Sequence, residues 1–514
     1  MKKLHFLLLL LISGSLLSQQ KIFQHKLDEN TLQPQQKITA ELASNYEKTE
    51  YFLQLPFNLN GELEITLPGG RIIKATNTNR YSYSNKTTSF VYSIQNEPYS
   101  DLVFSKFENV VTGMYMSQDG EKVMFHQTKD NIFAVSVVNQ SKLDQQEKKD
   151  DFITVPAEEL DKAFLINPDV CSPSTAICPA TTIDVMILFT AEVKNIWGGL
   201  AQSNTNAATA ITNFNISLAN SGVTNTTINL VYSGEIAYTE TGNISTDLSR
   251  LRSSTDGFLD EAHTLRATYG ADLVSLVTST PTNTCGLGYV NTNSTNYSNT
   301  LAFTVSLYNC AVSNLTIAHE MGHNMGLNHD WYVSTTTNPC SHHHGYVNQE
   351  AITLGTASPT NTRWRTIMAY TDQCSDAGIN CPKINRWANP DLNWNGHPTG
   401  KPLTDLQPSH EVFGFMRFAC VVSNFMPTVV LGAQESIYES GDVAIYPNPA
   451  SEFVEVSVKG VKNPVFRVFN AVGQQVLTTK NSKFSVAHWT KGSYFISVYD
   501  DQNSLVASKK FLVK

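Results

Sequence analysis

The most constraining feature of this sequence is the run from His319 to Asp330, which reads His-Glu-Met-Gly-His-Asn-Met-Gly-Leu-Asn-His-Asp. On a helix, His319 and His323 are four residues apart and share one face, so both imidazoles can bind one metal ion. Gly326 tolerates a left-handed backbone and ends the helix, and the turn returns His329 to the same point. Three neutral imidazoles that leave a fourth position open indicate a catalytic rather than a structural zinc site.

Glu320 directly follows the first histidine. From this position on the helix it can reach a water molecule at the metal from the side, as a general base must. Either Ser313 or Asn314 is expected to cap the start of the helix. The alternative, in which these histidines are ordinary core or surface residues of a helix, gives the glutamate no chemical task.

The pattern resembles the extended zinc signature of the metzincin metallopeptidases. That family also has a methionine-containing turn beneath the metal, and the downstream run from Thr366 to Tyr370, Thr-Ile-Met-Ala-Tyr, matches it. Asp330 after the third histidine resembles the reprolysin (adamalysin) group, and so does the substrate-side strand from Cys285 to Val290. The tyrosine two residues after the methionine is more typical of astacin-like and serralysin-like members.

The resemblance implies a secreted zinc endopeptidase that hydrolyses peptide bonds of extracellular proteins. The resemblance also implies that Glu320 is the general base and that Met368 forms an apolar floor under the metal. Tyr370 either donates a hydrogen bond to the oxyanion or only packs against the site. The resemblance also implies that an extended substrate peptide pairs with one strand by β-augmentation. The strand residues are Gly286, Leu287, Gly288 and Tyr289.

Two other functions remain open at this stage. One is a non-catalytic binding or adhesion protein on a metzincin scaffold, but intact His319, Glu320, His323 and His329 argue against it. The other is a pappalysin-like metzincin. Members of that group commonly have Thr after the third histidine, so Asp330 disfavours it.

The start of the chain indicates export. A short positive segment precedes an apolar run and then small and polar residues, so residues 1–18 are expected to form a signal peptide. Later stretches are too short to span a membrane. In an oxidising compartment the 8 cysteines favour disulfides. Cys171 could be a latency thiolate at the zinc ion, but we favour a local bridge from Cys171 to Cys178.

Residues 19–170 are expected to form a mostly antiparallel β domain. Alternating stretches such as 61–67 and 131–138 are separated by Pro-Gly-Gly and Asp-Gly turns. The charged, glutamine-rich run from Asp144 to Asp151 is typical of an exposed linker. Because the block lies between the signal peptide and the enzyme, we interpret it as a propeptide, although an ordinary accessory domain is the alternative.

Residues 171–430 are expected to form the α/β metzincin catalytic domain, with a zinc helix and a Met-turn. Its strands and helices alternate. Residues 183–189, 228–232 and 271–277 have strand patterns, and residues 207–218 and 258–269 have helix patterns.

A predicted linker, residues 431–442, leads to a small β-sandwich at residues 443–514. Ile445-Tyr446-Pro447-Asn448-Pro449 opens this block, and Lys509-Lys510-Phe511-Leu512-Val513-Lys514 closes it. It resembles the C-terminal sorting domain of the type IX secretion system in Bacteroidetes. That resemblance implies a protein that is secreted or held at the cell surface, with the secretion machinery as a partner. A carbohydrate- or protein-binding module is the alternative.

Composition and the remaining motifs limit the classes of molecule and metal ion that the chain is expected to bind. The net charge of −9 offers no basic surplus for nucleic acid. Asp391 opens a run like a calcium loop, but Pro402 stands where a bidentate Glu is needed, so a standard helix–loop–helix calcium site is rejected, and Ca(2+) elsewhere in the chain is left open without support. The run from Ser341 to His344 contains three histidines, for which we expect a structural or surface role.

Overall fold

The computed structural model describes residues 19–147, 151–156, 160, 163–165, 171–280, 284–293, 296–427, 443–458, 461, 463–470, 475–499 and 505–514. The chain divides into two compact units, Met1–Thr428 and Val429–Lys514. The predicted signal peptide at residues 1–18 and the predicted linker at residues 431–442 lie outside the described residues.

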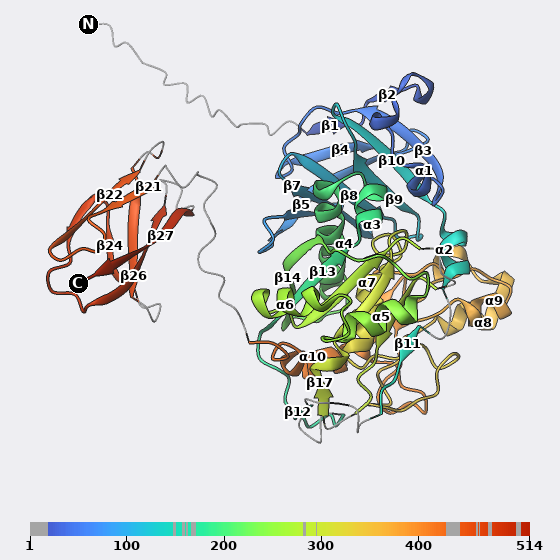
Figure 1. The fold of residues 1–514 in the computed structure, drawn as a ribbon. Coiled ribbons are helices and arrows are strands. Elements are labelled where there is room, and N and C mark those ends of the chain that lie inside the picture. The colour runs from blue at the N-terminus through green and yellow to red at the C-terminus, as the bar shows by residue number, and fades with distance from the viewer. Residues whose placement is uncertain are drawn as a thin grey trace, which may run out of the picture. The chain divides into compact units, whose positions relative to one another are not determined.

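The N-terminal part of the larger unit is a ten-stranded sheet (Figure 1). Its paired neighbours are antiparallel except for one parallel pair at the β1 edge, which confirms the predicted mostly antiparallel block. Buried aromatic residues such as Phe104 and Phe125 fill its core. The spatial order is β1 (Gln20–Ile22), β4 (Glu62–Thr66), β5 (Ile72–Ser82), β6 (Thr88–Ile94), β7 (Glu97–Phe107), β8 (Val110–Met116), β9 (Lys122–Gln127), β10 (Ile132–Val138), β3 (Tyr46–Leu53) and β2 (His25–Leu27).

A second sheet of six strands forms the centre of the α/β part. Four strands are parallel and most of their residues are buried, as expected for strands that are covered on both faces. The edge strand β16 runs antiparallel to β18, and β11 is added outside it in parallel. The spatial order is β11 (Phe152–Ile153), β16 (Gly286–Tyr289), β18 (Phe303–Leu307), β15 (Leu273–Thr278), β13 (Thr181–Phe189) and β14 (Thr226–Glu235).

Helix α4 (Leu200–Asn220) joins the two sheets into one unit (Figure 1). Its apolar face packs in the common core, as the periodicity predicted, but its polar face is buried as well. The Thr205 hydroxyl lies 2.7 Å from that of Thr112 on β8, and the Thr209 hydroxyl donates to Ser105 on β7 at 2.9 Å. Hydroxyl pairs thus satisfy buried polar groups between helix and sheet.

The other helices and short strands surround the α/β sheet. Helix α7 (Thr316–Asn324) packs against β16 and β18 and carries the first two histidines of the sequence motif. The remaining α-helices and strands in the described part of this unit are α1 (Ala40–Ala43), α2 (Gln140–Gln146), α3 (Ala191–Trp197), α5 (Ile244–Arg252), α6 (Asp260–Tyr269), α8 (Gln349–Leu354), α9 (Asp372–Asp376), α10 (Glu411–Val422), the pair β12 (Ala163–Leu165) and β17 (Asn296–Ser298), and the hairpin β19 (Asn389–Trp394) and β20 (His397–Thr399).

The prediction about the cap of α7 is wrong. The residue before the helix is Leu315 in a left-handed conformation, with a φ of 58° and no side-chain cap. The Ser313 hydroxyl instead donates to the Asn309 carbonyl at 2.7 Å. Asn314 donates to the Glu147 carboxylate, so its side chain is used in a long-range contact.

All eight cysteines form disulfides, but the predicted bridge from Cys171 to Cys178 is wrong. Each of these two cysteines pairs with a distant partner, because the folded chain brings segments that are far apart in sequence into contact. Cys171 is oxidised and therefore offers no latency thiolate. The pairs are Cys171–Cys340, Cys178–Cys420, Cys285–Cys310 and Cys374–Cys381.

The smaller unit contains two antiparallel sheets around one apolar core, as predicted for a small β-sandwich. Residues from both sheets, such as Val456 and Ile496, are buried in that core. One sheet contains β21 (Val443–Tyr446), β22 (Phe453–Val458) and β25 (Lys483–Ser485). The other contains β24 (Gln475–Thr479), β23 (Val465–Asn470), β26 (Gly492–Tyr499) and β27 (Leu505–Val513).

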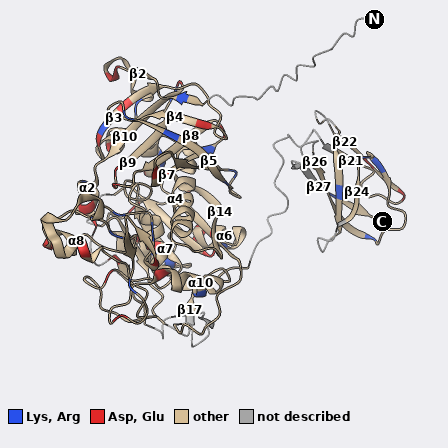
Figure 2. Cartoon of the chain, turned by 180° about the vertical axis from the view of Figure 1, so that it is seen from behind, with Lys and Arg blue, Asp and Glu red and all other residues tan. Residues whose placement is uncertain are grey.

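Charged residues are sparse and interspersed among uncharged ones in the view of Figure 2. Within the described part of the chain, no helix has both the length and the apolar character needed to cross a membrane.

Candidate metal centre

Three imidazoles converge on one point, and a carboxylate lies there. The Asp151 carboxylate oxygens lie 3.1 Å from His319 Nε2, 3.3 Å from His323 Nε2 and 2.7 Å from His329 Nε2. Helix α7 supplies the first two histidines from one face, as the spacing predicted, and the loop after Gly326 supplies the third. Gly326 has a φ of 85°, which confirms the predicted left-handed turn.

The donor set fits a metal ion such as zinc. His319 Nδ1 donates to the Ile367 carbonyl at 2.9 Å, and His323 Nδ1 donates to the Leu327 carbonyl at 2.8 Å. With Nδ1 protonated, each Nε2 keeps its lone pair directed to the common point. Burial lowers the pKa of His319 and lowers that of His323 to about 4, so both rings are neutral at neutral pH.

Glu320 is buried beside this point, and its Oε2 atom has no hydrogen-bond partner among the described residues. Burial and then the nearby Asp151 carboxylate raise the pKa of Glu320 well above its usual value. Gly286 on β16 makes room for it, because a Cβ atom there would lie 2.2 Å from Glu320 Oε1. One oxygen of the buried glutamate thus remains without a hydrogen-bond partner in the described part of the chain.

A turn containing Met368 lies directly against α7. A Cβ atom at Gly322 would be 2.9 Å from the Met368 sulfur, so the glycine permits this close packing. The Asp330 carboxylate accepts a hydrogen bond from the Tyr370 backbone N–H at 2.9 Å. The Tyr370 hydroxyl donates to Asp151, so its side chain reaches the centre where the imidazoles converge.

The three adjacent histidines after Ser341 are buried, and two of them hydrogen-bond to the segment around His329. His343 Nδ1 donates to the Gly326 carbonyl at 2.9 Å, and His344 Nδ1 donates to the His329 carbonyl at 2.6 Å. Cys340 lies near two of these rings but is held in a disulfide, so it offers no thiolate for a metal. The group braces the loop that presents His329.

The run expected to be an exposed linker instead enters the centre. Asp151 is 4% exposed, and β11 pairs in parallel with β16. The Asp151 carbonyl accepts from Gly288 N–H at 3.0 Å, and the Ile153 carbonyl accepts from Val290 N–H at 3.1 Å. Asp144 and Glu147 of the same run are also largely buried, because they form ion pairs with Arg365 and Lys383 from a distant part of the sequence.

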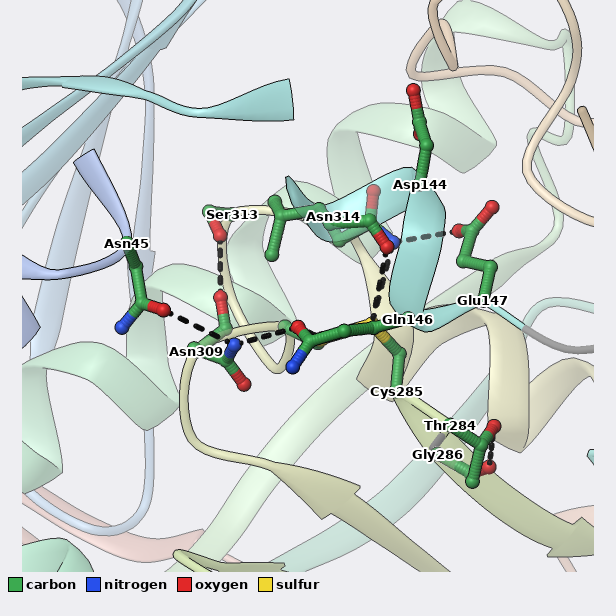
Figure 3. Close-up of a disulfide and its surroundings, with 12 residues drawn as sticks. Asn45, Asp144, Gln146, Glu147, Thr284, Cys285, Gly286, Asn309, Ser313 and Asn314 are labelled. Carbon is green, nitrogen blue, oxygen red and sulfur yellow. Dashed lines mark hydrogen bonds between the residues drawn. A yellow bond between two sulfur atoms is a disulfide. The ribbon is translucent and has the colours of Figure 1, made fainter. Parts of the chain in front are cut away.

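The end of α2 is held close to the start of α7 (Figure 3). Gln146 accepts a hydrogen bond from Asn309 at 2.8 Å, and Glu147 accepts one from Asn314 at 2.6 Å. Asn314 also lies 3.9 Å from the sulfur of Cys285, which is joined to Cys310. This network fixes the chain shortly before Asp151.

Arg365 and Lys383 complete the surroundings of this segment. Arg365 Nη2 lies 3.0 Å from Asp144 Oδ1 and 2.8 Å from Glu147 Oε2, and Lys383 Nζ lies 2.6 Å from Glu147 Oε1. Although burial alone raises the pKa of Glu147, Arg365 and Lys383 hold it at about 2.

Sequence reasoning missed Asp151, Glu147, Arg365 and Lys383. One signal was available, since the apolar pair Phe152–Ile153 directly follows the charged run and is typical of a docked rather than an exposed segment. The loop opened by Asp391 lies in the β19–β20 hairpin.

Residues 179–386 match the model of metallo-peptidase family M12, and residues 444–514 match a secretion system C-terminal sorting domain. The chain is similar to a peptidyl-Asp metalloendopeptidase of Stenotrophomonas maltophilia (strain R551-3), with 30% identity over 62% of this chain and 70% of that protein. A protein of the same name from Xanthomonas campestris pv. campestris is 34% identical over 43% of this chain and 48% of its own length.

Proposed function

Because the chain belongs to metallo-peptidase family M12, with the peptidyl-Asp metalloendopeptidases among its relatives, it is a zinc metalloendopeptidase, and we propose that His319, His323 and His329 bind the zinc. The observation that carries this proposal is the approach of three imidazole Nε2 atoms to a single carboxylate within 3.3 Å. The bound ion supplies Lewis acidity, which polarises the scissile carbonyl.

Glu320 is the general base of the proposed reaction. Its free carboxylate oxygen takes the proton of the attacking water and passes it to the leaving amine. Tyr370 reaches the same centre and is placed to donate to the oxyanion once Asp151 has left. Met368 and the loop braced by Asp330 keep the three imidazoles in position.

The edge strand β16 is the proposed substrate platform, with Gly286, Leu287, Gly288 and Tyr289. Its Gly288 N–H and the following Val290 N–H already bind an extended segment, formed by Asp151 to Ile153. An extended substrate peptide can use the same donors by β-augmentation.

The test of this assignment is Glu320→Gln, which preserves size but removes the base. We expect peptide cleavage to fall at least about a hundredfold while zinc stays bound, as measured by elemental analysis. Glu192→Gln, at an exposed position in the first turn of α3, is the matched control. Retained turnover in Glu320→Gln contradicts the proposed base.

Residues 19–170 act as a propeptide in this proposal. The Asp151 carboxylate occupies the point between the imidazoles, and Phe152 and Ile153 occupy the edge of β16, so a substrate cannot enter. In the full-length chain, Asp151→Ala is expected to give peptidase activity before any cleavage of the chain. The control is Asp119→Ala, in an exposed turn of the N-terminal sheet. If the uncleaved chains of both variants have equally low peptidase activity, the proposed role of Asp151 is contradicted.

We further infer a substrate preference for aspartate at the cleaved bond, from the name of the relatives. The test compares two peptides that differ only by Asp or Asn at one position, using the activated full-length chain with and without a zinc chelator. Chelator-sensitive cleavage that does not distinguish the two peptides contradicts the preference but not the peptidase assignment.

The sorting domain at residues 444–514 makes this a secreted or cell-surface protein that uses type IX secretion. In the proposed route the signal peptide at residues 1–18 is removed first. The protein then crosses the outer membrane, and the sorting domain is removed last. Deletion of residues 443–514 is expected to trap the protein in the periplasm, which cell fractionation measures. Normal release of the deleted form contradicts this route.

A further inference from the structure

We propose that Arg365 and Lys383 form the subsite that recognises an acidic side chain of the substrate, and that Glu147 occupies this subsite in the latent protein. The inference rests on the proposed function, because it assigns the aspartate preference to named residues of this chain.

The carboxylate of Glu147 is divided between the two cations. Lys383 Nζ lies 2.6 Å from Oε1, and Arg365 Nη2 lies 2.8 Å from Oε2. Asn314 Nδ2 donates to Oε1 as well, at 2.6 Å. Lys383 and Asn314 thus donate to Oε1, and Oε2 faces the Arg365 guanidinium in an ion pair. A carboxylate meets this demand, whereas an amide would direct its NH₂ group toward a cation.

The subsite is preorganised by the enzyme part of the chain. Arg365 Nε donates to the Cys381 carbonyl at 3.1 Å, and Nη1 donates to the Ala369 carbonyl at 2.6 Å, which leaves Nη2 for the carboxylates. Its guanidinium is therefore held in one orientation before any ligand arrives. A donor fixed in this way loses little freedom on binding, which favours selectivity.

The subsite lies within reach of the bond to be cleaved. Ala369, whose carbonyl accepts from Arg365, directly follows Met368, and Met368 packs against Gly322, the residue before His323. Glu147 is four residues before Asp151, and four extended residues span at most about 14 Å. A peptide that crosses the metal centre can therefore place a nearby side chain between the two cations.

The two cations need a carboxylate partner. Arg365 is 0% and Lys383 2% exposed, and among the described residues the carboxylates that form ion pairs with them, Asp144 and Glu147, both belong to the propeptide. Departure of the propeptide removes both of these carboxylates and leaves the two positive charges without them, so an anion that replaces them is favoured. The acidic substrate side chain is the proposed replacement.

The test uses the full-length chain activated by limited proteolysis, with the Asp and Asn peptide pair. Wild type is expected to favour the Asp peptide in kcat/KM by at least about tenfold. In Lys383→Met, this ratio is expected to fall close to one, because the Asp peptide loses the cation that pairs with its carboxylate. Lys383→Arg should retain the preference, and Lys383→Glu should favour a Lys peptide over the Asp peptide.

Lys194→Met, which removes a partly exposed lysine of α3, is the matched control and should keep the wild-type ratio. A wild-type Asp-to-Asn ratio in Lys383→Met overturns the inference and leaves the peptidase function intact. Absence of a preference in wild type overturns both the aspartate preference and the subsite, while chelator-sensitive cleavage still supports the peptidase.

A second measurement does not depend on folding of a Lys383 variant. A synthetic peptide with the sequence of residues 140–153 is added to the activated wild-type chain, and its inhibition constant is measured. The same peptide with Glu147→Gln is expected to inhibit at least about tenfold more weakly, because only the carboxylate satisfies both cations. Equal inhibition by the two peptides overturns the subsite.

Discussion

The Asp330 carboxylate accepts a hydrogen bond from the backbone N–H of Tyr370 at 2.9 Å. Its other oxygen accepts from the Tyr332 backbone N–H at 3.0 Å. The residue after the third histidine thereby fixes both its own loop and the turn that contains Met368. This geometry gives a physical reason for an acidic residue at position 330, since a carboxylate offers two acceptors for two backbone donors.

Asp330→Asn tests this role. The amide nitrogen cannot accept, so one of the two backbone N–H groups loses its partner, and we expect the free energy of unfolding to fall by about 1–3 kcal/mol. Chemical denaturation of the full-length chain measures the change. Asp391→Asn, at a mostly exposed side chain, is the control and should be nearly neutral.

Gly286→Ala tests how closely β16 packs against the base. The added Cβ would lie 2.2 Å from Glu320 Oε1 and 2.7 Å from Thr316 Cγ2, so the glutamate must move. We expect kcat/KM of the activated chain to fall at least about tenfold, since a small displacement of a catalytic group is costly. Gly288→Ala, with a contact of 3.1 Å to the Glu320 carbonyl, should have a smaller effect. Equal rates for both variants and wild type contradict the packing argument.

The convergence of the three histidines could be predicted from the sequence, because helix geometry and a glycine turn are local properties. His319 and His323 share a face by spacing alone, and Gly326 has the predicted left-handed backbone. The strand predictions are confirmed for the same reason, because alternation and apolar runs are also local properties. The apolar run at 183–189 lies in β13, which is buried from position 185 onward.

The position of Asp151 could not be predicted in this way. Its segment is polar and charged, and its burial depends on the Arg365 and Lys383 contacts of nearby Glu147, more than two hundred residues away in sequence. The predicted disulfide was wrong because it also relied on sequence distance alone. The short spacing of Cys171 and Cys178 favoured a local bridge, whereas each of them pairs with a cysteine that is distant in sequence.

The observed disulfides predict unequal losses of stability. Cys178–Cys420 has a sequence separation of 242 and Cys374–Cys381 one of 7. By loop-closure entropy, replacing the first pair with serines should cost about 5 kcal/mol and replacing the second about 2 kcal/mol. Thermal unfolding of the two double variants measures the difference, and a larger loss for the short loop contradicts this ranking.

Asp272 predicts a dependence of stability on pH. Burial raises its pKa to about 7, although the Asp184 and Met426 backbone N–H groups donate to it and act in the opposite direction. The charge of Asp184 raises this pKa further, and that of Arg266 lowers it. The raised value means that the folded protein binds this proton more tightly than the unfolded chain, in which an aspartate has a pKa of about 3.9.

The proton on Asp272 therefore stabilises the fold fully below about pH 4, and this stabilisation is lost as the pH rises to about 7. Across this range the free energy of unfolding is expected to fall by about 4 kcal/mol. Asp272→Asn cannot ionise, so its free energy of unfolding should show a weaker decline across this range. Denaturation curves at a series of pH values, compared with Asp119→Asn at an exposed turn, measure the slope. Parallel pH profiles for wild type and Asp272→Asn contradict the protonated state of this buried carboxyl.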